Sequence, residues 1–157
     1  MRRSGWRVAR GSVSGSRSLR LVLDSNVYIH GFSESRPPVA ARLFELLVDE
    51  PDRFELIISR TILQEVEQNL PPRAYGVCWG FLTAMDVEQV ESWQIPFETG
   101  SRYRERGLKP GDAFIAALAE WSGAEYLVTE NRHFMARSTL PFKVAKMEDF
   151  LKVVEKR

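Results

Sequence analysis

Residues 19–27 read Leu-Arg-Leu-Val-Leu-Asp-Ser-Asn-Val, an apolar run that ends in an acid and continues into polar residues. The part from Arg20 to Leu23 has the length and composition of a short buried strand, and Asp24 follows at its tip. Side chains at the carboxyl ends of parallel strands converge on one crevice of an open α/β sheet. The segment therefore predicts a strand that delivers a carboxylate to such a crevice.

The rest of the chain alternates strand-like and helix-like runs, which is the pattern of a sheet with helices on its faces. Strands are predicted at 54–59, within 87–97, at 125–129 and at 142–146, and helices at 37–50, 61–70, 73–85, up to 107, at 110–121 and at 148–154. Prolines open several of these helices, and Gly123 lies just past the end of one. The prediction is one α/β domain with a mostly parallel central sheet of about five strands flanked by helices.

The size and composition indicate an ordinary globular protein. Its 157 residues are 44% hydrophobic and 27% charged, and this length suits a single domain. No apolar stretch approaches the roughly 18 residues that a membrane span needs. The single cysteine, Cys78, leaves no internal disulfide and suits a reducing cytosol, so we expect a cytoplasmic protein with a buried, inert thiol.

The net charge of +1 hides an asymmetry, because the first 20 residues contain six arginines and no acid. We predict that residues 1–18 are a disordered basic leader and that 19–157 form the folded domain. The composition of the leader is compatible with a tail that contacts nucleic acid, with a targeting peptide and with a start-site artefact. The sequence favours none of the three.

Two further acids are expected at the same crevice. Glu65 lies on the predicted helix 61–70, and Asp112 opens the apolar helix 110–121. Two carboxylates about 5 Å apart repel by roughly 3 kcal/mol at an effective dielectric of about 20, so a cluster of acids needs a cation. Mg²⁺ or Mn²⁺ held by oxygen ligands serves phosphodiester chemistry. The three acids therefore indicate a metal-dependent nuclease.

Each acid also has a structural explanation. Asp24 or Asn26 is a typical cap of a following helix. Glu65 is compatible with a solvated helix face, and Asp112 with a favourable charge in the first turn of a helix. The polar residues 129–134, after another predicted strand, can likewise form a turn. These explanations account for each position singly but not for their joint placement.

Four segments, in this order, resemble the PIN-domain ribonucleases, especially their small toxin members of the VapC type. They are residues 23–27, Ser59 with Glu65, residues 107–117 and residues 127–134, and the resemblance extends from residue 19 to the end of the chain. It implies a PIN-like fold, RNA as substrate, one or two Mg²⁺ or Mn²⁺ ions, a homodimer and an antitoxin partner. Where many members carry a fourth acid this chain has Asn131, so its site holds one charge fewer.

The resemblance also implies roles for individual residues. The expected catalytic residues are Asp24, Glu65, Asp112 and Asn131; the first three are the expected metal ligands, and Ser25, Asn26 and Thr129 are expected to donate supporting hydrogen bonds. Glu65 would place the ion or accept a proton from the attacking water, and Asn131 would position a water or a phosphate oxygen. An RNA backbone is expected along Arg102, Arg104, Arg106, Lys109 and Arg132, although mixed charge of this kind is also typical of solvated surface.

Other interpretations of these residues remain open. Neither His30 nor His133 is expected to be catalytic, and two histidines give little support for a zinc site. A non-catalytic interaction module with a degraded site would explain Asn131, and a metal-binding measurement separates it from an enzyme. A phosphatase with Asp24 as nucleophile is a weaker rival, because Asn26 stands where such enzymes carry a second aspartate; trapping an aspartyl-phosphate would decide it. Trp79, Phe81 and Trp93 suit either a dimer interface or the core.

Overall fold

The computed structural model describes residues 18–135 and 139–156. The predicted leader falls on residues that, Ser18 apart, lie outside this part of the chain. The elements are β1 (Leu19–Leu23), α2 (Ser25–Phe32), α3 (Pro38–Asp49), η1 (Pro51–Arg53), β2 (Phe54–Ser59), α4 (Arg60–Asn69), α5 (Pro72–Ala84), β3 (Glu88–Val90), η2 (Ser92–Gln94), α6 (Phe97–Glu105), α7 (Pro110–Trp121), β4 (Tyr126–Val128), α8 (Arg132–Met135), β5 (Lys143–Ala145) and α9 (Met147–Glu155). None of the helices in these residues is long and apolar enough to cross a membrane.

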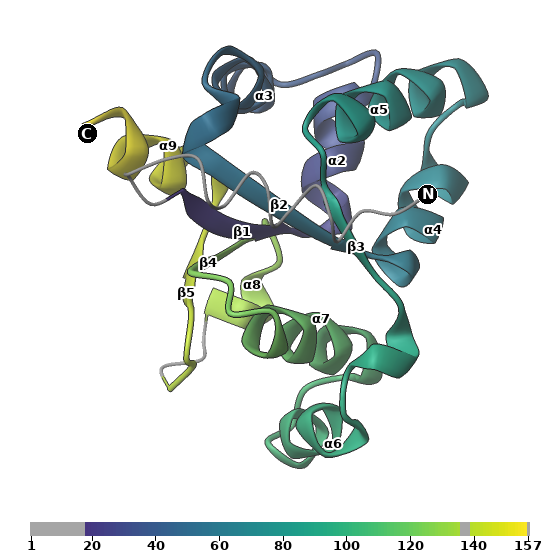
Figure 1. Cartoon of the computed structure of the whole chain (residues 1–157), viewed down its shortest axis with the longest axis vertical. Helices are drawn as coiled ribbons and strands as arrows, with labels where there is room; N and C mark the ends of the chain where they lie inside the picture. Colours follow the sequence, from purple (N-terminus) through teal and green to yellow (C-terminus); the bar gives the residue numbers. More distant parts are fainter. Residues whose placement is uncertain (1–17, 136–138, 157) are drawn as a thin grey trace.

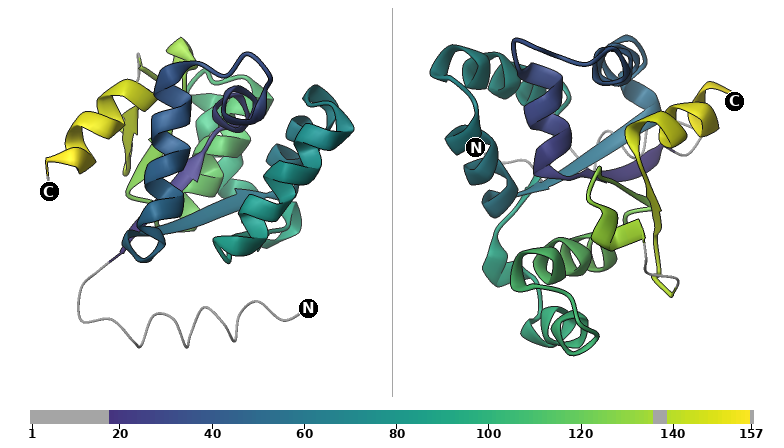
Figure 2. Two further views of the ribbon diagram at one scale, coloured as in Figure 1. Left: turned by 90° about the horizontal axis from the view of Figure 1, so that it is seen from above. Right: turned by 180° about the vertical axis from the view of Figure 1, so that it is seen from behind.

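The predicted α/β fold with five strands is confirmed, and its strand pairs are all parallel. The strand order is β3-β2-β1-β4-β5, with β1 in the centre. Helices α2, α3 and α5 lie on one side of the sheet and α6 and α7 on the other (Figures 1 and 2). The chain builds outward from β1 through β2 to β3, then returns through α6 and α7 to β4 on the other side of β1. The gap between the carboxyl ends of β1 and β4 is therefore the point where the winding direction reverses, and such points form binding crevices.

Helix α7 is buried on most of its circumference, which explains its apolar sequence. Ile115 through Ala119 are all buried, and the helix contacts α6 and β1. It ends in a left-handed turn at Gly123 (φ 72°), where the amide of Ala124 donates to the carbonyl of Ala119 and that of Gly123 to Glu120. These two hydrogen bonds close the helix at Gly123, a residue that tolerates a positive φ. The opposite end of α7, with Asp112, therefore has a fixed position at the carboxyl edge of the sheet.

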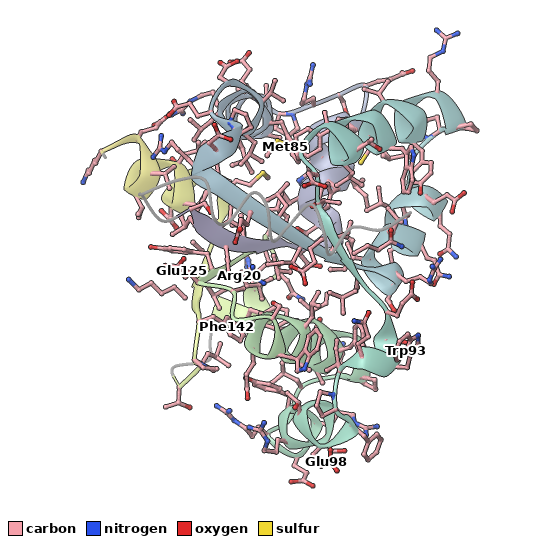
Figure 3. The ribbon with its side chains drawn as sticks, in the orientation of Figure 1. Arg20, Met85, Trp93, Glu98, Glu125 and Phe142 are labelled. Atoms are coloured by element: carbon pink, nitrogen blue, oxygen red, sulfur yellow. The ribbon has the colours of Figure 1, made fainter. Side chains whose placement is uncertain are left out.

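The amino edge of the sheet is held by Arg20 on β1. Its guanidinium donates to the carbonyl of Ser122 at 2.8 and 3.1 Å, and to the carboxylates of Glu55 at 3.0 Å and Glu88 at 3.4 Å. Figure 3 shows Arg20 beside Glu125, whose Oε1 accepts the backbone N–H of Arg20 at 3.3 Å. A cation at the C-terminus of a helix is favourable. Arg20 thus ties α7 to three strands at the edge remote from the candidate site.

A close approach between α2 and α3 occurs at Gly31. A Cβ atom at this position would overlap the ring of Phe44, which is already enclosed by Phe32 and Phe81 at centroid distances of 4.9 and 5.2 Å. We expect Gly31→Ala to destabilise the protein by about 1–3 kcal/mol, because the surrounding rings leave Phe44 little room to move. Chemical denaturation measures the change.

Gly80→Ala is the matched control for this substitution. Gly80 lies on α5, and a Cβ there meets no atom within 4 Å. The control is expected to stabilise the protein by about 0.5–1 kcal/mol, because alanine loses less backbone entropy in a helix than glycine does. Equal effects of the two substitutions would contradict close packing at Gly31.

Candidate functional site

Two neighbouring strands deliver Asp24 and Thr129 side by side at the switch point. Asp24 follows β1 and caps α2, and its backbone N–H donates to the carbonyl of Val128 at the end of β4 at 2.9 Å. Thr129 follows β4, and its own N–H donates to the carbonyl of Ala145 at 3.0 Å. The sheet ladder thus continues one residue beyond the strands and fixes both backbones. Their side chains are buried, with exposed fractions of 4% for Asp24 and 0% for Thr129.

The hydroxyl of Thr129 is the centre of a hydrogen-bond network. It donates to Oδ2 of Asp24 at 2.7 Å and accepts from the backbone N–H of Asn131 at 3.0 Å. The side-chain amide of Asn26 also donates to it, at 3.4 Å. The other oxygen of Asp24, Oδ1, accepts the N–H of Ser25 at 2.7 Å. Both oxygens of this carboxylate are therefore held in place, as is usual for a buried polar group.

Asn131 connects this network to Asp112. Its Nδ2 donates to Oδ1 of Asp112 at 3.1 Å, and its Oδ1 accepts the N–H of His133 at 2.9 Å in the first turn of α8. Because the amide oxygen is used by the backbone of α8, the NH₂ group faces the carboxylate. The structure thus brings Asp24, Asp112 and Asn131 together through direct hydrogen bonds and the bridging Thr129.

The charges at this edge act on Asp24. Burial raises the pKa of the Asp24 carboxyl above its ordinary value, and the negative charges of Glu65 and Asp112 raise it further. The hydrogen bonds from Thr129 and Ser25 oppose this rise, because they favour the ionised form. The site therefore concentrates negative charge around a poorly solvated carboxylate, an arrangement that a cation would stabilise.

Glu65 contributes to this field without direct contact. It lies on the second turn of α4 with an exposed side chain, and within the described residues no hydrogen bond joins its carboxylate to Asp24 or Asp112. In residues 18–135 and 139–156, no three His, Cys, Asp or Glu side chains converge as a ready metal site. The structure thus joins two of the three acids by one network and leaves the third at its periphery.

The five basic residues expected along the RNA differ in their surroundings. Arg102 forms an ion pair with Glu120 at 3.0 Å, and Arg106 donates to the carbonyl and the hydroxyl of Thr139, both at 2.7 Å. Arg104 lies over the ring of Phe97, with its guanidinium carbon 5.5 Å from the centroid. Lys109, the N-cap residue that precedes α7, and Arg132, the first residue of α8, are exposed beside the network. Arg102 and Arg106 therefore already have protein partners.

Sequence reasoning gave no role to Glu130, which supports the site. Its Oε2 accepts the N–H of Met147 at the start of α9 at 2.9 Å, and its own N–H donates to Oδ1 of Asn26 at 3.3 Å. Both the amide nitrogen and the amide oxygen of Asn26 therefore have hydrogen-bond partners. The bond from Met147 anchors α9 to the turn after β4. An acid directly after a strand was the only signal, and it does not reveal a partner 17 residues away.

Cys78 is buried as predicted, and burial raises the pKa of its thiol to about 12.

Thr129→Val is expected to cost about 1–3 kcal/mol of stability. Valine has nearly the same shape, but it leaves the N–H of Asn131 without its acceptor and leaves Oδ2 of Asp24 with only the long hydrogen bond from Nδ2 of Asn26 at 3.5 Å. Thr129→Ser keeps the hydroxyl and removes only a methyl group, worth about 0.8 kcal/mol. Urea denaturation in EDTA compares the two. A valine variant as stable as the serine variant would mean that the hydroxyl does not hold the network together.

A family model described as the PIN domain matches residues 20–133. No curated protein sequence matches the chain.

Three solved structures illustrate the similarity of fold. PAE2754 from Pyrobaculum aerophilum is 18% identical with a TM-score of 0.58, covering 91% of this chain and 100% of that one. VapBC2 from Rickettsia felis, bound to a DNA fragment from its promoter, is 19% identical with a TM-score of 0.55, covering 82% and 98%. VapC20 from Mycobacterium tuberculosis, a toxin that cleaves the sarcin–ricin loop, is 14% identical with a TM-score of 0.50, covering 77% and 99%. At these identities the similarity concerns the fold.

Proposed function

The chain belongs to the PIN-domain family, and we propose on that premise that it is a metal-dependent endoribonuclease that hydrolyses phosphodiester bonds of RNA. The observation that carries the proposal is the pair of carboxylates, Asp24 and Asp112, linked by Thr129 and Asn131 at the switch point of the sheet. The activity of VapC20 on the sarcin–ricin loop supports RNA as the substrate class by analogy of fold.

The residues at this edge fit a divalent cation with oxygen ligands. Asp24 is buried, and two neighbouring negative charges add to burial in raising its pKa, so a cation removes an electrostatic cost there. Mg²⁺ and Mn²⁺ prefer carboxylate oxygens and retain waters. We assign the ion to Asp24 and Asp112, with Glu65 as the third acid. When bound, such an ion polarises the phosphodiester and lowers the pKa of a bound water.

The protein's own groups prepare the reaction. The N–H of Ser25 and the hydroxyl of Thr129 orient Asp24 before substrate binds, which avoids reorganisation during the reaction. Glu65 is exposed on α4, so its side chain is free to turn toward the crevice and accept a proton from the attacking water. Asn131 has one N–H on Asp112 and a second that we assign to a phosphate oxygen of the RNA.

The RNA backbone is assigned first to Lys109 and Arg132. Both side chains are exposed, and they flank the network from the start of α7 and α8. Arg104 extends this surface along α6. Arg102 and Arg106 would have to exchange the carboxylate of Glu120 and the oxygens of Thr139 for phosphates, so we give them a smaller share.

We propose further that the enzyme is a cytoplasmic toxin, homodimeric, with an antitoxin as its protein partner. The support is the shared fold with the toxin of the VapBC2 complex, in which toxin and antitoxin are bound to promoter DNA. A neighbouring gene for a small DNA-binding protein would identify the antitoxin. Co-purification of the two proteins, with loss of RNA cleavage in the complex, would test the pairing, and light scattering would give the oligomeric state.

The direct test of the enzyme is cleavage of labelled single-stranded RNA by the purified protein with Mg²⁺ or Mn²⁺. Addition of EDTA is expected to stop cleavage, and excess Mn²⁺ is expected to restore it. A protein that neither binds Mn²⁺ in calorimetry nor cleaves RNA under any of these conditions would be the non-catalytic interaction module instead. Cleavage that continues in EDTA would contradict the metal assignment.

A further inference from the structure

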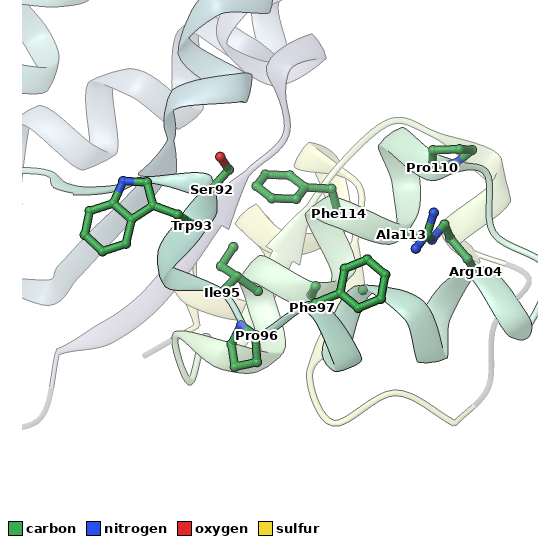
Figure 4. Close-up of a pocket in the computed structure, with 11 residues that line it drawn as sticks. Ser92, Trp93, Ile95, Pro96, Phe97, Arg104, Pro110, Ala113 and Phe114 are labelled. Atoms are coloured by element: carbon green, nitrogen blue, oxygen red, sulfur yellow. The ribbon is translucent and has the colours of Figure 1, made fainter.

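A cavity of about 490 Å³ lies between residues 92–100 and the first turns of α7. Its walls include three aromatic side chains, Trp93, Phe97 and Phe114, with Arg104 at one end. Figure 4 shows Trp93 at one side of the group of lining residues and Arg104 with Pro110 at the other. The volume falls within the range of about 300–1,000 Å³ that is usual for small-molecule sites.

Two of the aromatic rings are unusually exposed. Trp93 and Phe97 have exposed fractions of 81% and 75%, the highest of the large hydrophobic side chains in the part of the chain that the structure describes. Ser92 to Gln94 form the 3-10 helix η2, and the core side chain Ile95 anchors the segment that follows. The chain thus holds both rings at the surface on an ordered backbone. Exposed apolar groups arranged in this way mark binding surfaces.

The cavity adjoins the candidate active site through helix α7. Ala113 and Phe114 line the cavity, and Asp112 immediately precedes them in the first turn of that helix. A molecule seated in the cavity therefore lies against the same helical turn as a proposed metal ligand. The lining residues of α7, Pro110, Ala113, Phe114 and Ala117, form one stripe of the helix, and Asp112 lies about 150° around the helix from that stripe at roughly 100° per residue. A nucleotide bound in the cavity is therefore separated from the carboxylates by the width of α7, and it would be a neighbour along the strand of the nucleotide that is cleaved.

The charges near the cavity favour a nucleic acid over an apolar protein surface. The guanidinium of Arg104 lies over the Phe97 ring and lines the cavity, and exposed Lys109 precedes Pro110 on its wall. Aromatic faces with interleaved cations bind single-stranded nucleic acid, because bases stack on the rings and phosphates pair with the cations.

We propose that this cavity is a subsite for one unpaired nucleobase of the RNA, stacked on Trp93 or Phe97 with its phosphate near Arg104. The inference rests on the proposed function, because RNA is the substrate assigned to the adjacent carboxylates. The cavity adds a source of substrate selection to the carboxylates: the enzyme prefers RNA in which a base near the cleaved bond is free to leave a helical stack, as in loops and single strands.

Binding of a fluorescein-labelled single-stranded RNA hexamer, measured by anisotropy in EDTA, tests the subsite without cleavage. Removal of the ring on which the base stacks, by Trp93→Ala or by Phe97→Ala, is expected to weaken binding about 5- to 100-fold, the usual effect of removing an aromatic stacking partner. Trp93→Phe should retain most of the affinity. Trp79→Ala is the matched control, because Trp79 is 44% exposed on α5, outside the cavity lining. Both substituted side chains are at the surface, so the variants are expected to fold.

Hexamers with a single abasic position identify the base. One abasic position should weaken wild-type binding, and Trp93→Ala or Phe97→Ala should cause little further loss with that oligonucleotide. Unchanged RNA affinity in both alanine variants would overturn the proposal, and so would a change confined to oligomeric state in light scattering, which would assign the surface to a second copy. If the wild-type protein cleaves RNA and both alanine variants bind RNA with unaltered affinity, only the subsite is rejected. Binding that depends on the rings, in a protein that does not cleave, would reject only the nuclease.

Discussion

Asp112→Asn is expected to reduce RNA cleavage by about 10²–10⁴-fold, because it removes a charge from the proposed cation site, whose contribution to the transition state is several kcal/mol. The structure makes this substitution a mild one for the fold. The amide oxygen introduced at position 112 can still accept from Nδ2 of Asn131. The loss of a favourable charge in the first turn of α7, about 0.3–1 kcal/mol, is opposed by relief of repulsion with Asp24. A thermal melt in EDTA should therefore change little.

Asp24→Asn is expected to abolish cleavage as well, but with a cost in stability. Oδ1 of Asp24 accepts the N–H of Ser25, and Oδ2 accepts the hydroxyl of Thr129. The hydroxyl already accepts from Asn131 and Asn26, so it cannot easily reverse its direction. An amide at position 24 must therefore point its NH₂ group either at the N–H of Ser25 or at the hydroxyl of Thr129, and both of these groups are donors to Asp24. Asp112→Asn is the cleaner test of charge.

Single-turnover cleavage of the same labelled RNA, with enzyme in excess, measures both effects. The control is Asp52→Asn, which makes the same chemical change at an exposed position in η1, just before β2 and thus at the amino edge of the sheet. It should leave the rate unchanged. Substantial cleavage by both Asp24→Asn and Asp112→Asn would mean that a contaminating nuclease, or a different site, performs the reaction.

The fold could be predicted because its signals are local. Each signal lies within a few residues of the element that it predicts. These signals are the apolar runs of the strands, the prolines that open α3, α5 and α7, and Gly123 past the end of α7. Short elements were harder. The predicted strand within 87–97 proved to be three residues followed by η2, since so few residues carry no period of their own.

The site was only partly accessible from the sequence. In a parallel sheet the carboxyl ends of the strands share one edge, so the order of strands and helices alone places Asp24, Asp112 and the turn after β4 there. This placement can be predicted without knowledge of side-chain positions. The direction of the Asn131 amide is different, because it depends on the N–H of His133 and on Asp112, which approach from two helices. Arg60 and Glu91 form a bidentate ion pair across the ends of two strands, with two hydrogen bonds of 2.7 Å. The two residues are 31 positions apart in the sequence, and nothing in that spacing predicts the pair.

Asn131→Asp is expected to tighten Mn²⁺ binding about 10- to 100-fold. The substitution replaces the NH₂ group that faces Oδ1 of Asp112 at 3.1 Å, while the oxygen that accepts from His133 is retained. A favourable hydrogen bond thus becomes a repulsion between two carboxylates, which a cation converts into attraction. Calorimetric titration of both proteins with Mn²⁺ measures the change in affinity.

The same substitution should destabilise the protein in EDTA. Asp112 and the side chain at 131 are half-buried, so solvent screens the pair only partly, and a loss of about 1–3 kcal/mol follows from the repulsion and the lost hydrogen bond. For a domain of this size each kcal/mol lowers the melting temperature by about 2–4 °C. Saturating Mn²⁺ should recover the loss, because ligand binding stabilises the folded state in proportion to its affinity. Gln68→Glu, an exposed amide-to-acid change on α4, controls for added charge alone.

The two measurements together distinguish three positions for residue 131. A tighter ion with a lower melt in EDTA places the side chain within reach of both the cation and Asp112. A lower melt with unchanged Mn²⁺ affinity would leave Asn131 as a support of Asp112 alone. No change in either would remove it from the site. The donor to the phosphate oxygen would then have to be the ammonium group of Lys109 or the guanidinium of Arg132, the exposed donors nearest in the chain to Asp112 and Asn131.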